Sequence, residues 1–286
     1  MTAPSEDLVT ANGLRHHVLT WGSGPVDVVM CHGFLDIAWS FDQVATKLLE
    51  RGHTVAAFDW RGHGDTEWIG AGGYYHFADY VLDLDELLPQ LGDRPVHLVG
   101  HSMGGGACAM FAAARPAAIR TLCLIEGIGP PELEPRNAAK RITAWLDGVA
   151  RKRDKRGTPI ADLSEAVRRM RVRNPELDDD LGRFLAERST TAVEGGLRWS
   201  FDPLHRTLGP RPFARSQFQE VLSAILAPTL IVAGENGLRL PQEAEYLQAI
   251  ADHKLVEIAN VGHMIHWFEA ERLARELESF FTARAP

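Results

Sequence analysis

The chain has 286 residues, of which 45% are hydrophobic, and it carries a formal net charge of −8. A chain of this length can bury a large core, and its acidic balance argues against nucleic acid as a partner. We expect no membrane span, because no run of about 18 apolar residues occurs. We also expect no signal peptide, because the first residues lack a basic segment followed by an apolar one.

The three cysteines, Cys31, Cys108 and Cys123, stand in apolar stretches. Their odd number and their surroundings predict buried free thiols, which are typical of a reducing, cytoplasmic compartment. Their spacing does not match that of a metal site, so neither a disulfide framework nor a metal centre is expected.

Short apolar runs alternate with amphipathic stretches over the first 126 residues. Such runs are typical of strands buried on both faces, as in a largely parallel sheet covered by helices. Strands are predicted over residues 14–21, 26–31, 53–59, 95–100 and 121–125, and helices over residues 39–51, 77–91 and 103–114.

The pattern then changes, because helical stretches follow one another without strand signals. Helices are predicted over residues 136–150, 162–173, 178–188 and 213–226, around an irregular aromatic segment over 194–206. The alternation resumes with strands over 229–233 and 254–258 and helices over 241–251 and 265–281. We therefore expect a core of residues 1–130 and 226–286, and a helical cap of residues 131–225 that covers the carboxyl ends of the strands.

The predicted cap differs in charge from the rest of the chain. Residues 131–225 have a net charge of +4, whereas the remaining residues have a net charge of −12. The basic run over residues 151–156 is typical of a solvated helix end or loop, and a docking surface for an anion is the alternative.

The most informative motif is Gly-His-Ser-Met-Gly-Gly over residues 100–105, between an apolar run and a stretch of small residues. A serine becomes a strong nucleophile when a sharp turn between a strand and a helix exposes it beside a base. Gly100 and Gly104 would let the strand and the helix approach closely. Ser102 is therefore the predicted nucleophile.

A base can be placed beside this serine. His263 follows the last predicted strand, so it can reach a serine at another strand end, and it comes last in the chain, as the order serine, acid, histidine requires. His101 is interpreted as filling space beside the turn, and His266 as packing on its helix.

Two backbone amides complete the predicted chemistry. The N–H groups of Phe34, in His32-Gly33-Phe34, and of Met103 fall at compatible strand ends. Together they would form an oxyanion hole for the charge that develops during acyl transfer.

These motifs resemble those of the α/β-hydrolase family. The resemblance covers almost the whole chain outside the predicted cap. It implies a mostly parallel sheet flanked by helices, with the helical cap inserted between two strands. The segments that carry it are residues 32–34, 59–64, 100–105, 228–234 and 262–263.

The triad acid departs from the family pattern. Most members carry an aspartate after the strand that follows the cap, where this chain has Gly237. Some members, including a branch of haloalkane dehalogenases, instead carry a glutamate after the strand before the cap, and this resemblance assigns Glu126. Glu235 is the rival, and a dyad or another carboxylate such as Asp252 is a further alternative.

A serine nucleophile implies an acyl-enzyme that water hydrolyses. We therefore predict hydrolysis of a small carboxylic ester with an apolar acyl or aromatic group, without cofactor or metal. A lactonase, a hydrolase of carbon–carbon bonds or a perhydrolase could use the same triad, and a ligand-binding relative without catalysis is another alternative. Trp39, Trp145 and Trp199 are candidate substrate contacts, with packing in the helices and the cap as the alternative.

Overall fold

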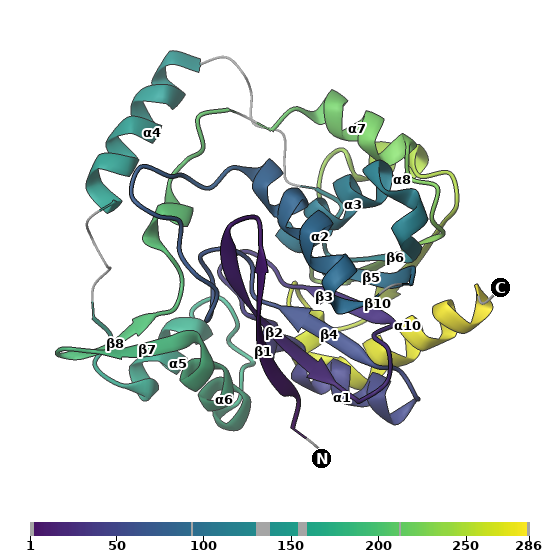
Figure 1. The fold of residues 1–286 in the computed structure, drawn as a ribbon, viewed down its shortest axis with the longest axis horizontal. Helices are drawn as coiled ribbons and strands as arrows, with labels where there is room; N and C mark the ends of the chain where they lie inside the picture. Colours follow the sequence, from purple (N-terminus) through teal and green to yellow (C-terminus); the bar gives the residue numbers. More distant parts are fainter. Residues whose placement is uncertain (1–2, 93, 130–137, 154–158, 212, 285–286) are drawn as a thin grey trace.

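An eight-stranded sheet lies at the centre of the computed structural model, which describes residues 3–92, 94–129, 138–153, 159–211 and 213–284. The strand order is β1-β2-β4-β3-β5-β6-β9-β10 (Figure 1). β1 and β2 run antiparallel to their neighbours, and the other pairs are parallel. The strands are β1 Ser5–Ala11, β2 Leu14–Trp21, β3 Val28–Cys31, β4 Val55–Phe58, β5 Val96–His101, β6 Ile119–Ile125, β9 Thr229–Gly234 and β10 His253–Ile258.

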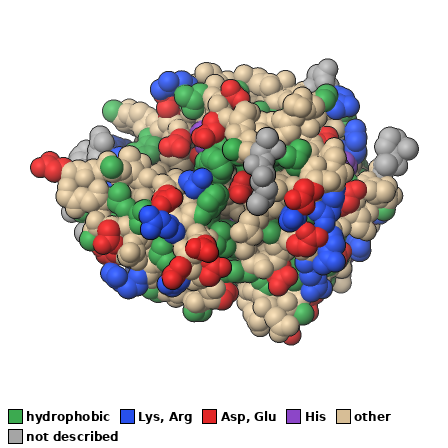
Figure 2. All heavy atoms as spheres, turned by 90° about the horizontal axis from the view of Figure 1, so that it is seen from below, with side chains coloured by type: hydrophobic (Ala, Val, Ile, Leu, Met, Phe, Trp, Pro, Cys, Tyr) green, Lys and Arg blue, Asp and Glu red, His purple; other side chains and the backbone are tan. Residues whose placement is uncertain are grey.

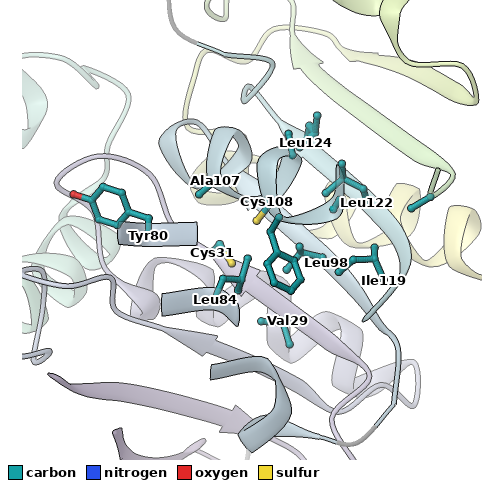
Figure 3. Close-up of a cluster of buried hydrophobic side chains, with 14 of the residues drawn as sticks. Val29, Cys31, Tyr80, Leu84, Leu98, Ala107, Cys108, Ile119, Leu122 and Leu124 are labelled. Atoms are coloured by element: carbon teal, nitrogen blue, oxygen red, sulfur yellow. The ribbon is translucent and has the colours of Figure 1, made fainter. Parts of the chain in front are cut away.

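Helices cover both faces of this sheet, so that alternate strand residues enter two separate cores. One face packs on α2 (Phe77–Leu91), α3 (Met103–Ala114), α7 (Arg215–Ser223) and α8 (Glu243–Ala249), and part of that core is shown in Figure 3. The other face packs on α1 (Asp42–Glu50), α9 (Ile265–Phe268) and α10 (Ala270–Ala283). The predicted fold class, an α/β-hydrolase fold with a mostly parallel sheet, is confirmed.

Several boundaries differ from the predicted ones. The strand β1 was not predicted because it is a polar, mostly exposed edge strand without an apolar run. The predicted helix over 39–51 begins as a 3₁₀ turn, η1 (Ala38–Phe41), before α1. The predicted helix over 265–281 is divided at Glu269, whose non-helical backbone separates α9 from α10.

A separate group of elements connects β6 to β9, which pair directly in the sheet. These elements are α4 (Ala138–Lys152), α5 (Leu163–Arg171), α6 (Asp179–Ser189), β7 (Thr190–Val193), β8 (Gly196–Trp199) and η3 (Pro203–Arg206). We call residues 138–153 and 159–207 the insert. The segment expected to be irregular over 194–206 instead contains β8, which pairs with β7 in an antiparallel hairpin.

The expected cap and the insert differ at their carboxyl-terminal end. Residues 131–137 lie outside the described residues, as do residues 154–156 of the basic run. At the other end, α7 packs on α3 and α8, and its Phe218 and Leu222 belong to the main core. The helix at residues 215–223 therefore covers the sheet and is not a roof over the strand ends.

The surface carries charges of both signs, intermixed with small apolar areas on the face shown in Figure 2. Cys31, Cys108 and Cys123 are free and buried. Among the helices of the described ranges, none has the length and apolar character that crossing a bilayer requires.

Candidate active site

Ser102 stands at the sharp turn between β5 and α3. Its backbone has φ 51° and ψ −116°, a conformation that costs energy in a residue with a side chain. The turn persists because the Ser102 amide donates to the Ile125 carbonyl at 2.9 Å, and because α3 packs closely on the neighbouring strands. A Cβ atom on Gly104 would lie 2.4 Å from the Cys31 carbonyl oxygen, and one on Gly100 would lie 2.7 Å from Gly105. The geometry is that of a nucleophile elbow.

His263 and Glu126 meet at the same edge of the sheet. Nδ1 of His263 lies 3.0 Å from Oε2 of Glu126. A carboxylate oxygen only accepts, so Nδ1 carries the hydrogen and the lone pair of a neutral imidazole is left on Nε2. The His263 side chain is 35% exposed, whereas that of Glu126 is 1% exposed. The imidazole is therefore open to solvent while its partner stays away from water.

The buried Glu126 carboxylate has two further donors. Oε1 accepts from the Gly234 amide at 2.7 Å, and Oε2 accepts from the Leu238 amide at 2.6 Å. A buried charge is tolerated when hydrogen bonds satisfy its oxygens. Glu126 itself has φ 51°, so the chain turns sharply after β6 and directs this side chain across to the end of β9.

The surroundings of Gly237 leave no room for the aspartate that most family members carry at this position. A Cβ atom at this position would lie 2.1 Å from Oε1 of Glu126 and 2.5 Å from its carboxyl carbon. The Glu126 carboxylate thus occupies the space that a side chain at 237 would enter. The glycine after β9 and the glutamate after β6 are parts of one arrangement.

The rival acids have other partners. Glu235 is exposed and accepts from the Asn260 amide at 2.8 Å. Asp252 forms an ion pair with Arg284 at 2.8 Å. Of the three carboxylates, it is Glu126 that contacts His263.

A loop between β3 and η1 carries the predicted oxyanion donor Phe34, and two residues whose role sequence analysis missed hold this loop. The Trp60 amide donates to Nε2 of His32 at 3.0 Å, so His32 donates from Nδ1 to the Gly33 carbonyl at 2.8 Å. Oδ1 of Asp59 accepts from the Ala38 amide at 2.7 Å. Both residues lie in the motifs at 32–34 and 59–64, which offered a signal for them.

A cavity of about 1080 Å³ opens beside Ser102, and Phe34, Met103 and Glu126 also line it. The volume is that of a site for a medium-sized organic ligand. Most of its wall comes from residues 74–80, before and within α2, and from residues 204–211 after the hairpin. The cavity therefore lies between the core and the end of the insert.

Three tyrosines that sequence analysis did not single out belong to the wall of this cavity. Their hydroxyl groups bond to the insert: Tyr74 to Thr207 at 2.6 Å, Tyr75 to Asp202 at 2.8 Å and Tyr80 to Nδ1 of His205 at 3.1 Å. Because each hydroxyl group already has a partner in the insert, the tyrosines offer their apolar rings to a ligand in the cavity. The pair Tyr74-Tyr75 beside a glycine-rich turn was the available signal, but its partners are more than 120 residues away along the chain.

His205 joins this wall to the core. Burial lowers its pKa to about 3, so the imidazole is neutral. It accepts from the Tyr80 hydroxyl at Nδ1 and donates from Nε2 to the Arg61 carbonyl at 3.1 Å. Its ring also lies against that of Tyr75, with ring centres 3.8 Å apart.

The three tryptophans predicted to contact substrate are not among the residues that line this cavity. Trp39 is placed between Trp21 and Phe184, Trp145 packs against Tyr74, and Trp199 belongs to a small apolar cluster inside the insert. Each ring therefore contacts other side chains of the protein, as the packing alternative expects. The expectation rested on ring size, which does not distinguish a wall from a core.

These features define an α/β-hydrolase fold, and comparison with known proteins agrees. The family model for the alpha/beta hydrolase fold matches residues 27–270. The chain belongs to this family. Its curated relatives include a serine hydrolase-like protein from Danio rerio, 26% identical over 93% of this chain and 85% of the relative. They also include N-formylmaleamate deformylase from Pseudomonas putida, 26% identical over 96% and 93%.

A solved structure shows the same likeness over the whole fold. The thioesterase domain from the curacin biosynthetic pathway superimposes with a TM-score of 0.88 and 31% identity, covering 97% of this chain and 100% of that domain.

Proposed function

We propose that this hydrolase cleaves carboxylic esters through an acyl-enzyme on Ser102, with His263 as the base and Glu126 as the residue that orients it. The observation that carries the proposal is the 3.0 Å contact between His263 Nδ1 and Glu126 Oε2 beside the strained Ser102 turn. It fixes the imidazole tautomer that can accept a proton at Nε2.

The proposed reaction uses this arrangement twice. Ser102 Oγ attacks the ester carbonyl while Nε2 of His263 takes its proton, and the Phe34 and Met103 amides stabilise the oxyanion. The imidazolium then protonates the departing alkoxide, which leaves the acyl group on Ser102. Water repeats the sequence, with His263 as base again, and releases the carboxylic acid.

The cavity supports an apolar acyl or aromatic group as the part of the substrate that is recognised. Its wall includes three tyrosine rings whose hydroxyl groups already have partners, together with apolar side chains such as Phe34 and Phe77. The size of the cavity exceeds what an acetyl group would fill.

A thioester is the second candidate substrate. The likeness to the curacin thioesterase domain favours it, since 31% identity extends over nearly the full length of both chains. The same triad can attack either carbonyl, so the leaving group distinguishes the two.

The proposal is tested with a fluorophosphonate probe and with matched p-nitrophenyl esters and acyl thioesters. We expect stoichiometric labelling of wild-type protein, no labelling of Ser102→Ala, and a loss of kcat of at least about 10³-fold in that variant. Higher kcat/KM on the thioesters would select the second candidate. Absence of both labelling and turnover in the wild type would contradict the proposal and favour a ligand-binding role without catalysis.

A further inference from the structure

His101, His266 and Asp36 form a buried polar cluster that the proposed reaction does not use. One ring nitrogen of each histidine and one carboxylate oxygen of Asp36 all lie within 4.8 Å of one another. Their residues are at most 9% exposed. They belong to three different parts of the site: His101 precedes Ser102, His266 lies one turn after His263, and Asp36 lies in the loop that carries Phe34.

His101 contacts the segment that holds the base. Its Nε2 lies 3.0 Å from the His263 carbonyl oxygen, which can only accept, so Nε2 carries the hydrogen. Burial holds the pKa of His101 well below its ordinary value, as do the neighbouring His266 and His263, so the ring is neutral. Its Nδ1 faces the oxyanion loop, since a Cβ atom on Gly33 would lie 2.7 Å from it.

His266 extends the cluster to Asp36. The two imidazoles of His101 and His266 are tilted against each other with centres 4.3 Å apart. Nε2 of His266 lies 3.2 Å from Oδ2 of Asp36, which also accepts from the Ser40 hydroxyl at 2.9 Å. The Asp36 amide in turn donates to the Gly33 carbonyl at 3.3 Å.

We propose that His101, His266 and Asp36 are positioning residues that fix the oxyanion loop and the His263 segment relative to the nucleophile elbow. The inference rests on the proposed function. The cluster spans the three segments that must keep one mutual geometry during acyl transfer. An error of about 1 Å between such groups can cost about 10²-fold in rate.

Two substitutions of His101 test the contact with His263. His101→Gln keeps an N–H near the position of Nε2, whereas His101→Met fills a similar volume without a donor. We expect His101→Met to lower kcat for p-nitrophenyl butyrate by about 10- to 100-fold with KM changed less than about threefold. His101→Gln should keep kcat within about fivefold of the wild type. Equal kcat in the two variants would overturn the proposal.

The Asp36 end supplies a test that does not depend on tolerance at His101. Asp36→Asn keeps an acceptor for His266, and Asp36→Leu removes it. A boronic acid forms a tetrahedral adduct on Ser102 that uses the oxyanion hole, so its Ki should rise by the same factor as kcat falls in Asp36→Leu. The double variant His101→Met/Asp36→Leu should lose less than the product of the single losses. An unchanged Ki in Asp36→Leu would overturn the proposal.

Covalent labelling and metal analysis complete the test of the cluster. Fluorophosphonate labelling of the wild type distinguishes failure of the proposed function, which abolishes labelling, from failure of this inference, which leaves labelling equal in all variants. Metal analysis of purified protein is expected to find no bound transition metal. One equivalent that Asp36→Leu removes would show a metal site and overturn the positioning role.

Discussion

The strand ends and the insert hold the site in different ways. At the strand ends, the amides of Gly234 and Leu238, at and after the end of β9, bond to the Glu126 carboxylate, and glycines let β5 and α3 approach within contact distance. The insert is joined to the cavity wall mainly through side chains, which connect Tyr74, Tyr75 and Tyr80 to residues 202–207. Backbone contacts leave little freedom for the reacting groups, whereas side-chain contacts can change with the ligand that is bound. Under the proposed function, the chemistry belongs to the first region and the selectivity to the second.

The largest expected effect tests the choice of acid in the first region. Glu126→Gln removes the charge that orients His263 and should lower kcat on an activated ester by about 10³- to 10⁴-fold. Glu235→Gln is the matched control because its partner is the Asn260 amide, and it should keep nearly the wild-type rate. Parallel steady-state kinetics check both. The reverse result would move the acid to the end of β9.

The second largest loss of kcat is expected when the space beside Glu126 is filled. In Gly237→Ala the new methyl group would lie 2.1 Å from Oε1, so the carboxylate must shift away from His263. We expect kcat to fall by about 10- to 100-fold. Gly70→Ala is the control, since no atom lies within 4 Å of a Cβ at that position. Equal rates for the two variants would show that Glu126 tolerates the displacement.

A smaller effect is expected at the contact between the cavity wall and the insert. Tyr80→Phe leaves Nδ1 of His205 without its donor, which loosens one side of the cavity. We expect kcat/KM for a long-chain ester to fall by about three- to tenfold, while that for an acetate ester stays within about twofold. Kinetics on an ester series measure the ratio. Equal losses on both esters would contradict an assignment of selectivity to this region.

The last prediction concerns the stability of the fold and not the rate of the reaction, at the loop that follows β4 and away from the cavity. Burial opposes a charge on His17, but its hydrogen bond and charge attraction to Asp59, together with the nearby carboxylates of Glu6 and Asp65, outweigh that cost and raise its pKa to about 9. Because the pKa of His17 is higher in the folded state than in the unfolded state, its protonation stabilises the fold. This contribution is complete at pH values below the unfolded-state pKa near 6.5, and it is lost as the pH rises through 9. The shift corresponds to about 3 kcal/mol.

Urea unfolding at pH 6, 7.5 and 9 measures this contribution in the wild type and in His17→Gln. The difference in unfolding free energy should be largest at pH 6 and should shrink toward pH 9. A difference that stays constant would show that the charge on His17 contributes nothing. Because Asp59 also accepts from the Ala38 amide, the result reports on the anchor of the oxyanion loop.

Much of the core could be predicted from sequence because its strands are buried on both faces and therefore appear as apolar runs. The helices at 77–91 and 103–114 agree with α2 and α3 at both ends. The strand β1 and the β7–β8 hairpin were missed because strands that are not buried on both faces lack such an apolar run.

The proposed nucleophile and base were likewise accessible to sequence analysis, because Ser102 and His263 lie in short motifs at strand ends. The cavity was not, because its wall joins residues 74–80 to residues 202–211, and no local pattern reports such a contact. Trp39, Trp145 and Trp199 illustrate this limit, since a large ring serves packing and binding equally well.

The joint placement of Glu126 and Gly237 has a consequence for how enzyme families are surveyed. A search profile that demands an aspartate after β9 would score this chain as a decayed member, although a carboxylate fills that same position from the neighbouring strand end. Counts of inactive homologues that rest on a single alignment position will therefore include sequences of this type. Scoring the two positions as a pair would separate a relocated acid from a lost one.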